Sequence, residues 1–135
     1  DDFRLFSGNE VGVLLTDFIA KRKVAMGIMP KNPVLVKTIV TTDLAKRVAD
    51  DYGIETRDVL TGFKYIGDQI AGLEKDGEVD RYLLGFEESY GYLSGSYVRD
   101  KDAVNGSYLI AQMFAYYKAK GKSLLEVLEG LYKKY

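Results

Sequence analysis

The chain contains no cysteine and no histidine among its 135 residues. Without cysteine it cannot form disulfides, and because short secreted domains often depend on them, the composition favours a reducing, cytoplasmic setting. Without histidine it lacks the usual general base near neutral pH, and zinc loses its two commonest protein ligands. Any proton transfer by this chain must therefore use carboxylates, lysine or tyrosine.

Long apolar runs and an excess of charge of one sign are also missing. No run approaches the roughly 20 apolar residues that span a bilayer, and the first residues, Asp-Asp-Phe-Arg, do not resemble a signal peptide. The 19 basic and 20 acidic residues give a net charge of −1, which is not the basic field that nucleic acids require. We therefore expect neither a membrane nor a nucleic acid as partner.

What remains is the composition of an ordinary globular protein, with 47% apolar and 29% charged residues. Because domains of about 100 to 150 residues are the commonest size, residues 1–135 are predicted to form a single domain. The first helix signal follows residues 1–6 directly, with no apolar strand before it. This start predicts that the chain is part of a larger enzyme.

Helix and strand signals alternate along the chain. Ser7 and Glu10 form a capping box that predicts the first helix. Runs rich in β-forming residues predict strands at 34–40, 54–60 and 82–86, and further helix starts near Thr42 and Thr61 separate them. This order predicts a three-layer α/β/α sandwich with a mostly parallel, mixed sheet of about four strands.

The C-terminal third is predicted to add extra helices to this sandwich. In one of them, four apolar residues are expected to share a buried face: Ile110, Met113, Phe114 and Tyr117. Ser123 and Glu126 form a second capping box that predicts the last helix.

Polar residues follow each predicted strand, at residues 41–43, 61–64 and 86–91. Ligands gather at the carboxyl ends of parallel strands, so these segments form the predicted site. If the last segment stays extended, Glu87 and Ser89 point to the same side and Glu88 points elsewhere. Their mixture of acceptors and donors suits sugar hydroxyls.

Each of these segments also has a purely structural interpretation. Residues 87–89 can be a solvated turn, and Thr61 with Gly62 can be only a helix N-cap and turn. The alternating charges of residues 99–102 are typical of a surface loop. The residues alone leave these alternatives open.

Taken together, the segments resemble the third domain of the α-D-phosphohexomutases, the family of phosphoglucomutase and phosphomannomutase. Their order and spacing carry the resemblance, which runs through most of the chain: Ser-Gly-Asn-Glu-Val-Gly (7 to 12), Val-Lys-Thr-Ile-Val-Thr-Thr (36 to 42), Leu-Thr-Gly-Phe-Lys-Tyr-Ile-Gly (60 to 67), Gly-Phe-Glu-Glu-Ser-Tyr-Gly (85 to 91) and Val-Arg-Asp-Lys-Asp (98 to 102).

The resemblance implies a parent enzyme of four domains that moves a phosphoryl group between the 1- and 6-positions of a hexose, through a phosphoserine and a bound Mg²⁺. The implied substrates are glucose 1-phosphate and glucose 6-phosphate, or their mannose equivalents. Glu87 and Ser89 match the family's sugar-recognition motif, and Thr61 and Gly62 match a loop beside the sugar. Lys101 matches a lysine near the reacting hydroxyl, and Lys37 matches a basic position near the active site.

The chain has no histidine for the family's Ser-His phosphoserine loop and no Asp-x-Asp-x-Asp metal loop. The resemblance therefore implies that other domains of the same polypeptide hold the phosphoserine and the Mg²⁺, and that the isolated chain is inactive. An alternative is a stand-alone sugar-phosphate-binding or regulatory α/β module. A hydrolase that uses Glu87 and Glu88 fits less well, because adjacent residues on an extended strand diverge.

Overall fold

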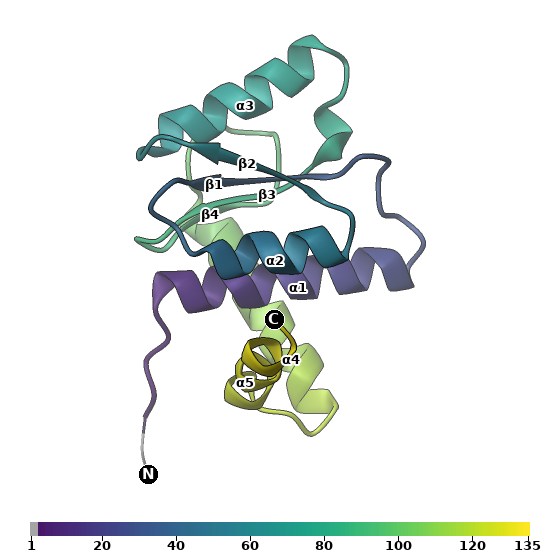
Figure 1. Ribbon diagram of the computed structural model, residues 1–135, viewed down its shortest axis with the longest axis vertical. Coiled ribbons are helices and arrows are strands. Elements are labelled where there is room, and N and C mark those ends of the chain that lie inside the picture. Colours follow the sequence, from purple (N-terminus) through teal and green to yellow (C-terminus); the bar gives the residue numbers. More distant parts are fainter. Residues whose placement is uncertain (1–2) are drawn as a thin grey trace.

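The computed structural model describes residues 3–135, and Figure 1 shows a sheet between layers of helices. The elements follow one another in the predicted alternation and end with two helices. They are α1 (Gly8–Ala25), β1 (Val34–Thr38), α2 (Asp43–Asp51), β2 (Glu55–Val59), α3 (Phe63–Lys75), the 3₁₀ turn η1 (Val79–Arg81), β3 (Tyr82–Glu87), β4 (Gly91–Leu93), α4 (Ala103–Ala119) and α5 (Leu124–Lys134).

The sheet has four strands in the order β2-β1-β3-β4. The central strand β1 pairs in parallel with β2 and with β3, whereas β4 pairs antiparallel with β3. Strand β1 thus has a neighbouring strand on each side, and all five of its residues are buried. The predicted α/β/α sandwich with a mixed sheet is therefore confirmed.

Helices cover both faces of the sheet. Figure 1 shows α3 alone on one side and α1 with α2 on the other, where α5 lies against α1. Two hydrophobic clusters fill these layers: one joins α1, α2, α4 and α5 to the sheet, and a smaller one lies beneath α3. The smaller cluster contains four residues of α3 that recur at helical spacing: Phe63, Ile66, Ile70 and Leu73.

The predicted capping box begins α1. The Glu10 amide donates to Ser7 Oγ at 3.1 Å, and the Ser7 amide donates to Glu10 Oε1 at 2.9 Å, so both ends of the motif are satisfied. At the start of α5 the Glu126 amide donates to Ser123 Oγ at 3.1 Å. Both helices begin where the sequence predicts.

Strand β1 is shorter than predicted. It ends at Thr38, and the next two residues, Ile39 and Val40, are 60% and 55% exposed. The Ile39 amide still donates to Val59 O, but the chain then turns, and the Thr41 amide donates back to Thr38 O. The β propensity of these two residues is overridden because the adjacent strand β2 also ends at Val59.

The predicted buried face of α4 is partly wrong. Met113 and Tyr117 are buried together with Leu109, which was not among the predicted residues, whereas Phe114 is 52% exposed. Helix α4 packs against β4 and α1 along a narrow stripe. Phe114 follows Met113 by one residue, about 100° around the helix, and so points away from that stripe.

Helix α1 can lie close to β3 because residue 12 is glycine. A Cβ atom on Gly12 would lie only 2.0 Å from Phe86 Cε2, and Phe86 is fully buried.

Among residues 3–135, no helix combines the length and the apolar character needed to cross a bilayer.

Candidate functional site

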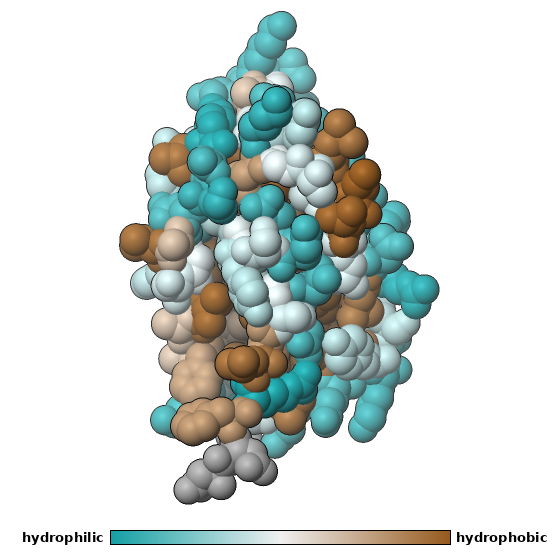
Figure 2. All heavy atoms as spheres, turned by 90° about the vertical axis from the view of Figure 1, so that its left-hand side faces the viewer, coloured by the Kyte–Doolittle hydropathy of each residue, from teal (hydrophilic) through white to brown (hydrophobic). Residues whose placement is uncertain are grey.

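The carboxyl ends of β1, β2 and β3 lie at one edge of the sheet, and helices α2 and α3 begin beside them (Figure 1). Figure 2 views the molecule from this side and shows hydrophilic side chains interspersed with separate hydrophobic ones. The three polar segments predicted to form a site therefore meet at one edge. We call residues 87–91 the β3–β4 turn.

The β3–β4 turn does not stay extended. Strand β3 ends at Glu87, residues 88–90 form a turn in which Tyr90 has a φ of 64°, and Gly91 pairs back with Glu87. The geometric argument that placed Glu87 and Ser89 on one side is therefore wrong beyond Glu87, because it required an extended backbone. Glu87 is half-buried and Ser89 is exposed.

Glu87 and Ser89 nevertheless both lie near Lys101. A Cβ atom placed on Gly91 would lie 2.8 Å from Glu87 Cγ and 3.1 Å from Lys101 Cδ, so these two side chains flank the same glycine. Ser89 and Lys101 line an open pocket of about 450 Å³ between the turn and the start of α4. The absence of a side chain at residue 91 makes this arrangement possible.

Glu88 points away from Glu87 and anchors the turn to β1. Its Oε2 lies 3.1 Å from Thr38 Oγ1 and 3.2 Å from Thr41 Oγ1, and the two hydroxyl oxygens are 2.7 Å apart. Each hydroxyl has one proton, so at most two of these three contacts are hydrogen bonds at once. In the sequence, Glu88 entered only the less favoured hydrolase alternative. Thr38 at the end of the central strand and Thr41 just after it were the available signal.

The start of α1 supports the same turn from below. A Cβ atom on Gly8 would lie 1.9 Å from Glu88 O. The Tyr90 hydroxyl donates to Phe6 O, and the Tyr92 hydroxyl donates to Gly8 O, both at 2.8 Å. Burial raises the pKa of Tyr92 above its usual value, so this phenol stays protonated and remains a donor.

The loop before α3 lies next to Lys101. Lys101 Nζ is 5.9 Å from the centre of the Phe63 ring, and Phe63 directly follows Gly62. Gly62 is the N-cap of α3 and has a φ of 118°, a backbone conformation that only glycine adopts without strain. Thr61 is exposed and does not cap the helix, so the N-terminus of α3 has no side-chain cap.

Lys101 itself is exposed, and its nearest carboxylate is Asp100 Oδ1, 3.4 Å from Nζ. The following residue, Asp102, caps α4 by accepting from the Val104 and Asn105 amides. The Tyr97 hydroxyl also donates to Asp102, and these bonds hold the pKa of Asp102 below its usual value. Asp102 thus fixes the loop that carries Lys101 to the start of α4.

Lys37 is a buried residue of β1, and its polar partners lie in β2, in the loop after β1 and at the start of α2. Only 1% of it is exposed, and its Nζ lies 2.7 Å from Asp58 Oδ1, 3.4 Å from Asp43 Oδ1 and 3.2 Å from Thr41 O. The ammonium therefore already has three oxygen partners within the chain. It ties the ends of β1 and β2 to the start of α2.

The structure thus brings Glu87, Ser89 and Lys101 together, with Gly62 close by. Lys37 is instead buried among its own oxygen partners, of which Thr41 also contacts Glu88. Carboxylate, hydroxyl and ammonium groups at one exposed edge can accept from and donate to a polyhydroxylated ligand. Groups of this kind can hold and orient such a ligand.

Comparison with known proteins gives a consistent result. Residues 7–135 match the family described as phosphoglucomutase/phosphomannomutase, alpha/beta/alpha domain III. The chain is 39% identical over 132 residues to the phosphoglucomutase of Staphylococcus saprophyticus, covering 98% of this chain and 23% of the relative. It is 34% identical over 128 residues to that of Staphylococcus haemolyticus, covering 95% of this chain and 22% of the relative.

A solved structure shares the fold. The crystal structure of the exocytosis-sensitive phosphoprotein pp63/parafusin, a phosphoglucomutase from Paramecium, aligns with a TM-score of 0.69 at 19% identity, over 95% of this chain and 21% of that protein. The chain thus spans about a quarter of the length of the relatives that it matches. On the strength of the match over residues 7–135, the chain belongs to the phosphoglucomutase/phosphomannomutase family and corresponds to its α/β/α domain III.

Proposed function

We propose that this chain is the sugar-binding domain of an enzyme that moves a phosphoryl group between the 1- and 6-positions of a hexose phosphate. Residues 1–135 form one domain of that enzyme, the third, with extra C-terminal helices. The observation that carries the proposal is the proximity of Glu87, Ser89 and Lys101 beside the uncapped start of α3. Glucose 1-phosphate and glucose 6-phosphate are the substrates we propose first, and the mannose equivalents second.

Each of these side chains has a role in the proposed site. The Glu87 carboxylate accepts from ring hydroxyls, the exposed Ser89 hydroxyl accepts or donates, and the Lys101 ammonium donates. Thr61 and Gly62 lie at the side of the sugar, next to Phe63. Because the two ends of a hexose present similar hydroxyls, the same groups hold the sugar in either of two orientations.

Lys101 is the proposed catalytic residue in this chain, acting near the reacting hydroxyl to orient it or assist its proton transfer. Lys37 is buried among its own oxygen partners and acts through them. It is a positioning residue that holds the loops after β1 and β2, including Thr61, in place. Glu88 positions the turn in the same way, through Thr38 and Thr41.

The phosphoryl group is supplied and received by a phosphoserine on another domain in this proposal. Phosphoryl transfer depends mostly on positioning and on neutralising charge. The family implies a Mg²⁺ ion, which would supply the neutralising positive charge. Within residues 3–135, however, no group of three or more acidic, histidine or cysteine side chains is placed to hold a metal. The described residues thus do not form a Mg²⁺ site, and we propose that another domain holds the ion.

A chimera tests this function. We would replace the matching segment of the Staphylococcus saprophyticus phosphoglucomutase with residues 1–135 and measure conversion of glucose 1-phosphate to glucose 6-phosphate. The chimera is expected to be active. The substitutions Glu87→Ala and Ser89→Ala are each expected to lower kcat/KM about 10- to 100-fold, because each removes one or two hydrogen bonds to the sugar.

Glu129→Ala is the matched control, because Glu129 is an exposed carboxylate on α5, away from the β3–β4 turn. It is expected to leave kcat/KM unchanged. Thermal unfolding of each variant would show that losses of activity do not reflect unfolding. A folded chimera without activity, or Glu87→Ala and Ser89→Ala variants with unchanged kcat/KM, would contradict the proposal.

The isolated chain provides a second test. We expect residues 1–135 alone to bind glucose 1-phosphate weakly and not to convert it, because one domain supplies only part of the polar groups around the sugar. Turnover of glucose 1-phosphate by the isolated chain would be incompatible with a phosphoserine on another domain.

A further inference from the structure

A second pocket lies at the opposite edge of the sheet from the β3–β4 turn. It has a volume of about 360 Å³ and lies between the C-terminal half of α1 and the middle of α4. Leu83, the second residue of β3, lines it, whereas the proposed sugar site begins at Glu87, the last residue of that strand. We call it the α1–α4 pocket; its volume falls in the range of small-molecule sites, about 300 to 1,000 Å³.

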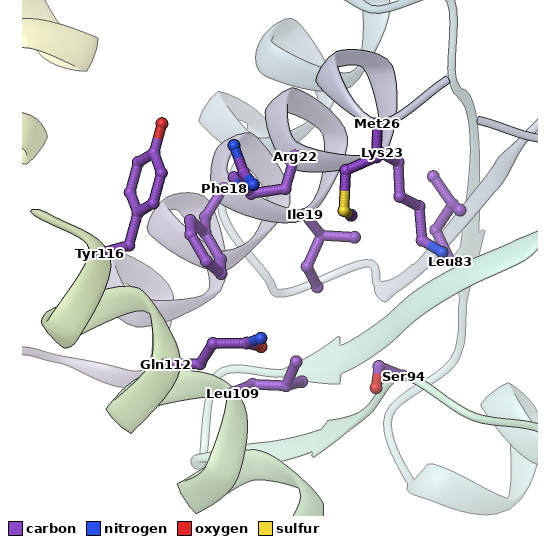
Figure 3. Close-up of a pocket in the computed structure, with 10 residues that line it drawn as sticks. All are labelled: Phe18, Ile19, Arg22, Lys23, Met26, Leu83, Ser94, Leu109, Gln112 and Tyr116. Atoms are coloured by element: carbon purple, nitrogen blue, oxygen red, sulfur yellow. The ribbon is translucent and has the colours of Figure 1, made fainter. Parts of the chain in front are cut away.

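The floor of the α1–α4 pocket is apolar. Figure 3 shows Phe18 and Ile19 of α1 facing Leu109 of α4 across the cavity, with Leu83 of the sheet at its end. All four side chains are at least nine-tenths buried. A flat apolar group that entered this space would therefore lose its contact with water on several sides.

The mouth of the pocket is cationic. Arg22 and Lys23 line it together with the neutral side chains of Ser94 and Gln112, and no acidic residue lines it. Among the described residues, neither Arg22 nor Lys23 forms an ion pair with a carboxylate. These two charges are thus uncompensated beside an apolar surface, which favours an anionic ligand.

A third cation reinforces this potential at the edge of the pocket. The Arg22 guanidinium lies 4.9 Å from the centre of the Tyr116 ring, and Lys120 Nζ lies 5.0 Å from the same centre. The ammonium of Lys120 and the guanidinium of Arg22 both lower the pKa of Tyr116. Two cations beside this ring add positive potential at the edge of the pocket, which favours an anionic group there.

We propose that the α1–α4 pocket binds a small molecule with a flat apolar body and a single anionic group, such as an aryl carboxylate or sulfonate. The body lies over Phe18, Ile19 and Leu109, and the anion lies beside Arg22 and Lys23. Apolar burial supplies affinity, and the two cations select the charge. This site is independent of the proposed sugar site.

The first experiment is a fluorescence titration of the 135-residue chain with 8-anilinonaphthalene-1-sulfonate, compared with the uncharged N-phenyl-1-naphthylamine. We expect one saturable site for the sulfonate. The double substitution of Arg22→Gln and Lys23→Gln is expected to weaken sulfonate binding at least fivefold at low salt and to change binding of the uncharged probe less than twofold. Lys118→Gln, an exposed cation on α4 outside the pocket, is the control and should change neither.

Gln112 allows a test that does not disturb the apolar floor. It is exposed on α4 at the mouth of the pocket. Gln112→Glu adds a negative charge there and is expected to weaken sulfonate binding about fivefold without weakening the uncharged probe. Gln112→Trp fills the mouth and is expected to weaken both probes at least tenfold, while thermal unfolding and far-UV circular dichroism confirm that each variant folds.

The location is checked by two-dimensional amide NMR, where the sulfonate should shift signals of residues 18–26, 83, 94 and 109–116. Shifts confined to residues 87–92, binding that none of the substitutions changes, or no saturation below about 1 mM would overturn the proposal. A second copy of the chain in the pocket would also overturn it. Sedimentation velocity would then show a dimer that Gln112→Trp converts to monomer.

Discussion

The substitution Gly12→Ala tests how closely α1 lies against β3. The added Cβ atom would lie 2.0, 2.4 and 2.6 Å from three atoms of the Phe86 ring. These distances are far below van der Waals contact, about 3.5 to 4.0 Å. Phe86 is fully buried and stacks against Tyr92 with ring centres 6.1 Å apart, so its ring cannot turn without displacing other buried atoms.

Two opposing effects decide the sign of the change in stability. Alanine is favoured over glycine inside a helix by about 0.5 to 1 kcal/mol. Overpacking a well-packed core is unfavourable by about 1 to 3 kcal/mol. Because the clash involves a fully buried ring, we expect the overpacking to dominate and the free energy of unfolding to fall by about 1 to 2 kcal/mol.

The assay is thermal and urea unfolding of the 135-residue chain, with Gly72→Ala as the matched control. Gly72 lies in α3, and a Cβ atom there would have no neighbour within 4 Å. This control is expected to raise the free energy of unfolding by about 0.5 to 1 kcal/mol. Gly12→Ala is expected to lower the unfolding midpoint by roughly 3 to 10 °C.

The combination of Gly12→Ala with Phe86→Leu separates the clash from other effects. Leucine removes the ring atoms that the new Cβ would meet, so Gly12→Ala is expected to be less destabilising in the Phe86→Leu background than alone. If Gly12→Ala stabilises the chain as much as Gly72→Ala does, the close approach of α1 to β3 is wrong.

Three further predictions concern the surroundings of the site. Asp58→Ala is expected to lower the free energy of unfolding by about 1 to 3 kcal/mol, because it leaves the buried Lys37 ammonium without its nearest carboxylate. Lys37→Met is expected to lower it by less. Urea unfolding measures both variants, and a larger loss for Lys37→Met would contradict the buried pairing. Because the pKa of Asp102 is lowered in the fold, its contribution to stability is present above its unfolded pKa of about 4 and is lost as the pH falls through the folded pKa. Thermal unfolding from pH 2 to 6 should thus show a weaker acid dependence for Asp102→Asn. An unchanged dependence would contradict the hydrogen bonds that Tyr97, Asn105 and Val104 donate to Asp102. Glu88→Ala should speed amide hydrogen exchange in the β3–β4 turn about tenfold or more, because the turn loses the contacts of Glu88 with Thr38 and Thr41. Unchanged exchange would show that Glu88 does not hold the turn.

Local signals in the sequence predicted the helices and their alternation with the strands. The capping box at Ser7 and Glu10 fixed the start of α1, and the apolar spacing from Phe63 to Leu73 identified the buried face of α3. Both depend on residues three or four positions apart. Such patterns are visible in the sequence because the contacts that they describe lie within one helix.

Strand β4 and the exact end of β1 were not predicted, because both depend on partners far along the chain. Strand β4 has only three residues and follows a turn with a positive φ at Tyr90. A strand that short is defined by its pairing with β3 and carries little periodicity of its own. Ile39 and Val40 favour a strand by propensity, but β1 ends before them.

The site residues were nominated from the sequence by their resemblance to a family motif, and their arrangement required the fold. Glu88 shows the difference: its neighbour Glu87 matched the motif, whereas the role of Glu88 arises from hydroxyls at Thr38 and Thr41, about 50 residues earlier in the chain. The α1–α4 pocket likewise combines residues of α1, β3 and α4. No local pattern connects them.

The proposal that Glu87 and Ser89 contact the sugar is tested most directly by a crystal structure of the active chimera with glucose 1-phosphate bound. We expect the Glu87 carboxylate and the Ser89 hydroxyl to lie about 2.6 to 3.2 Å from ring hydroxyls, with Lys101 on the same side of the sugar. A sugar bound at another surface, with both side chains directed into solvent, would contradict the proposed site.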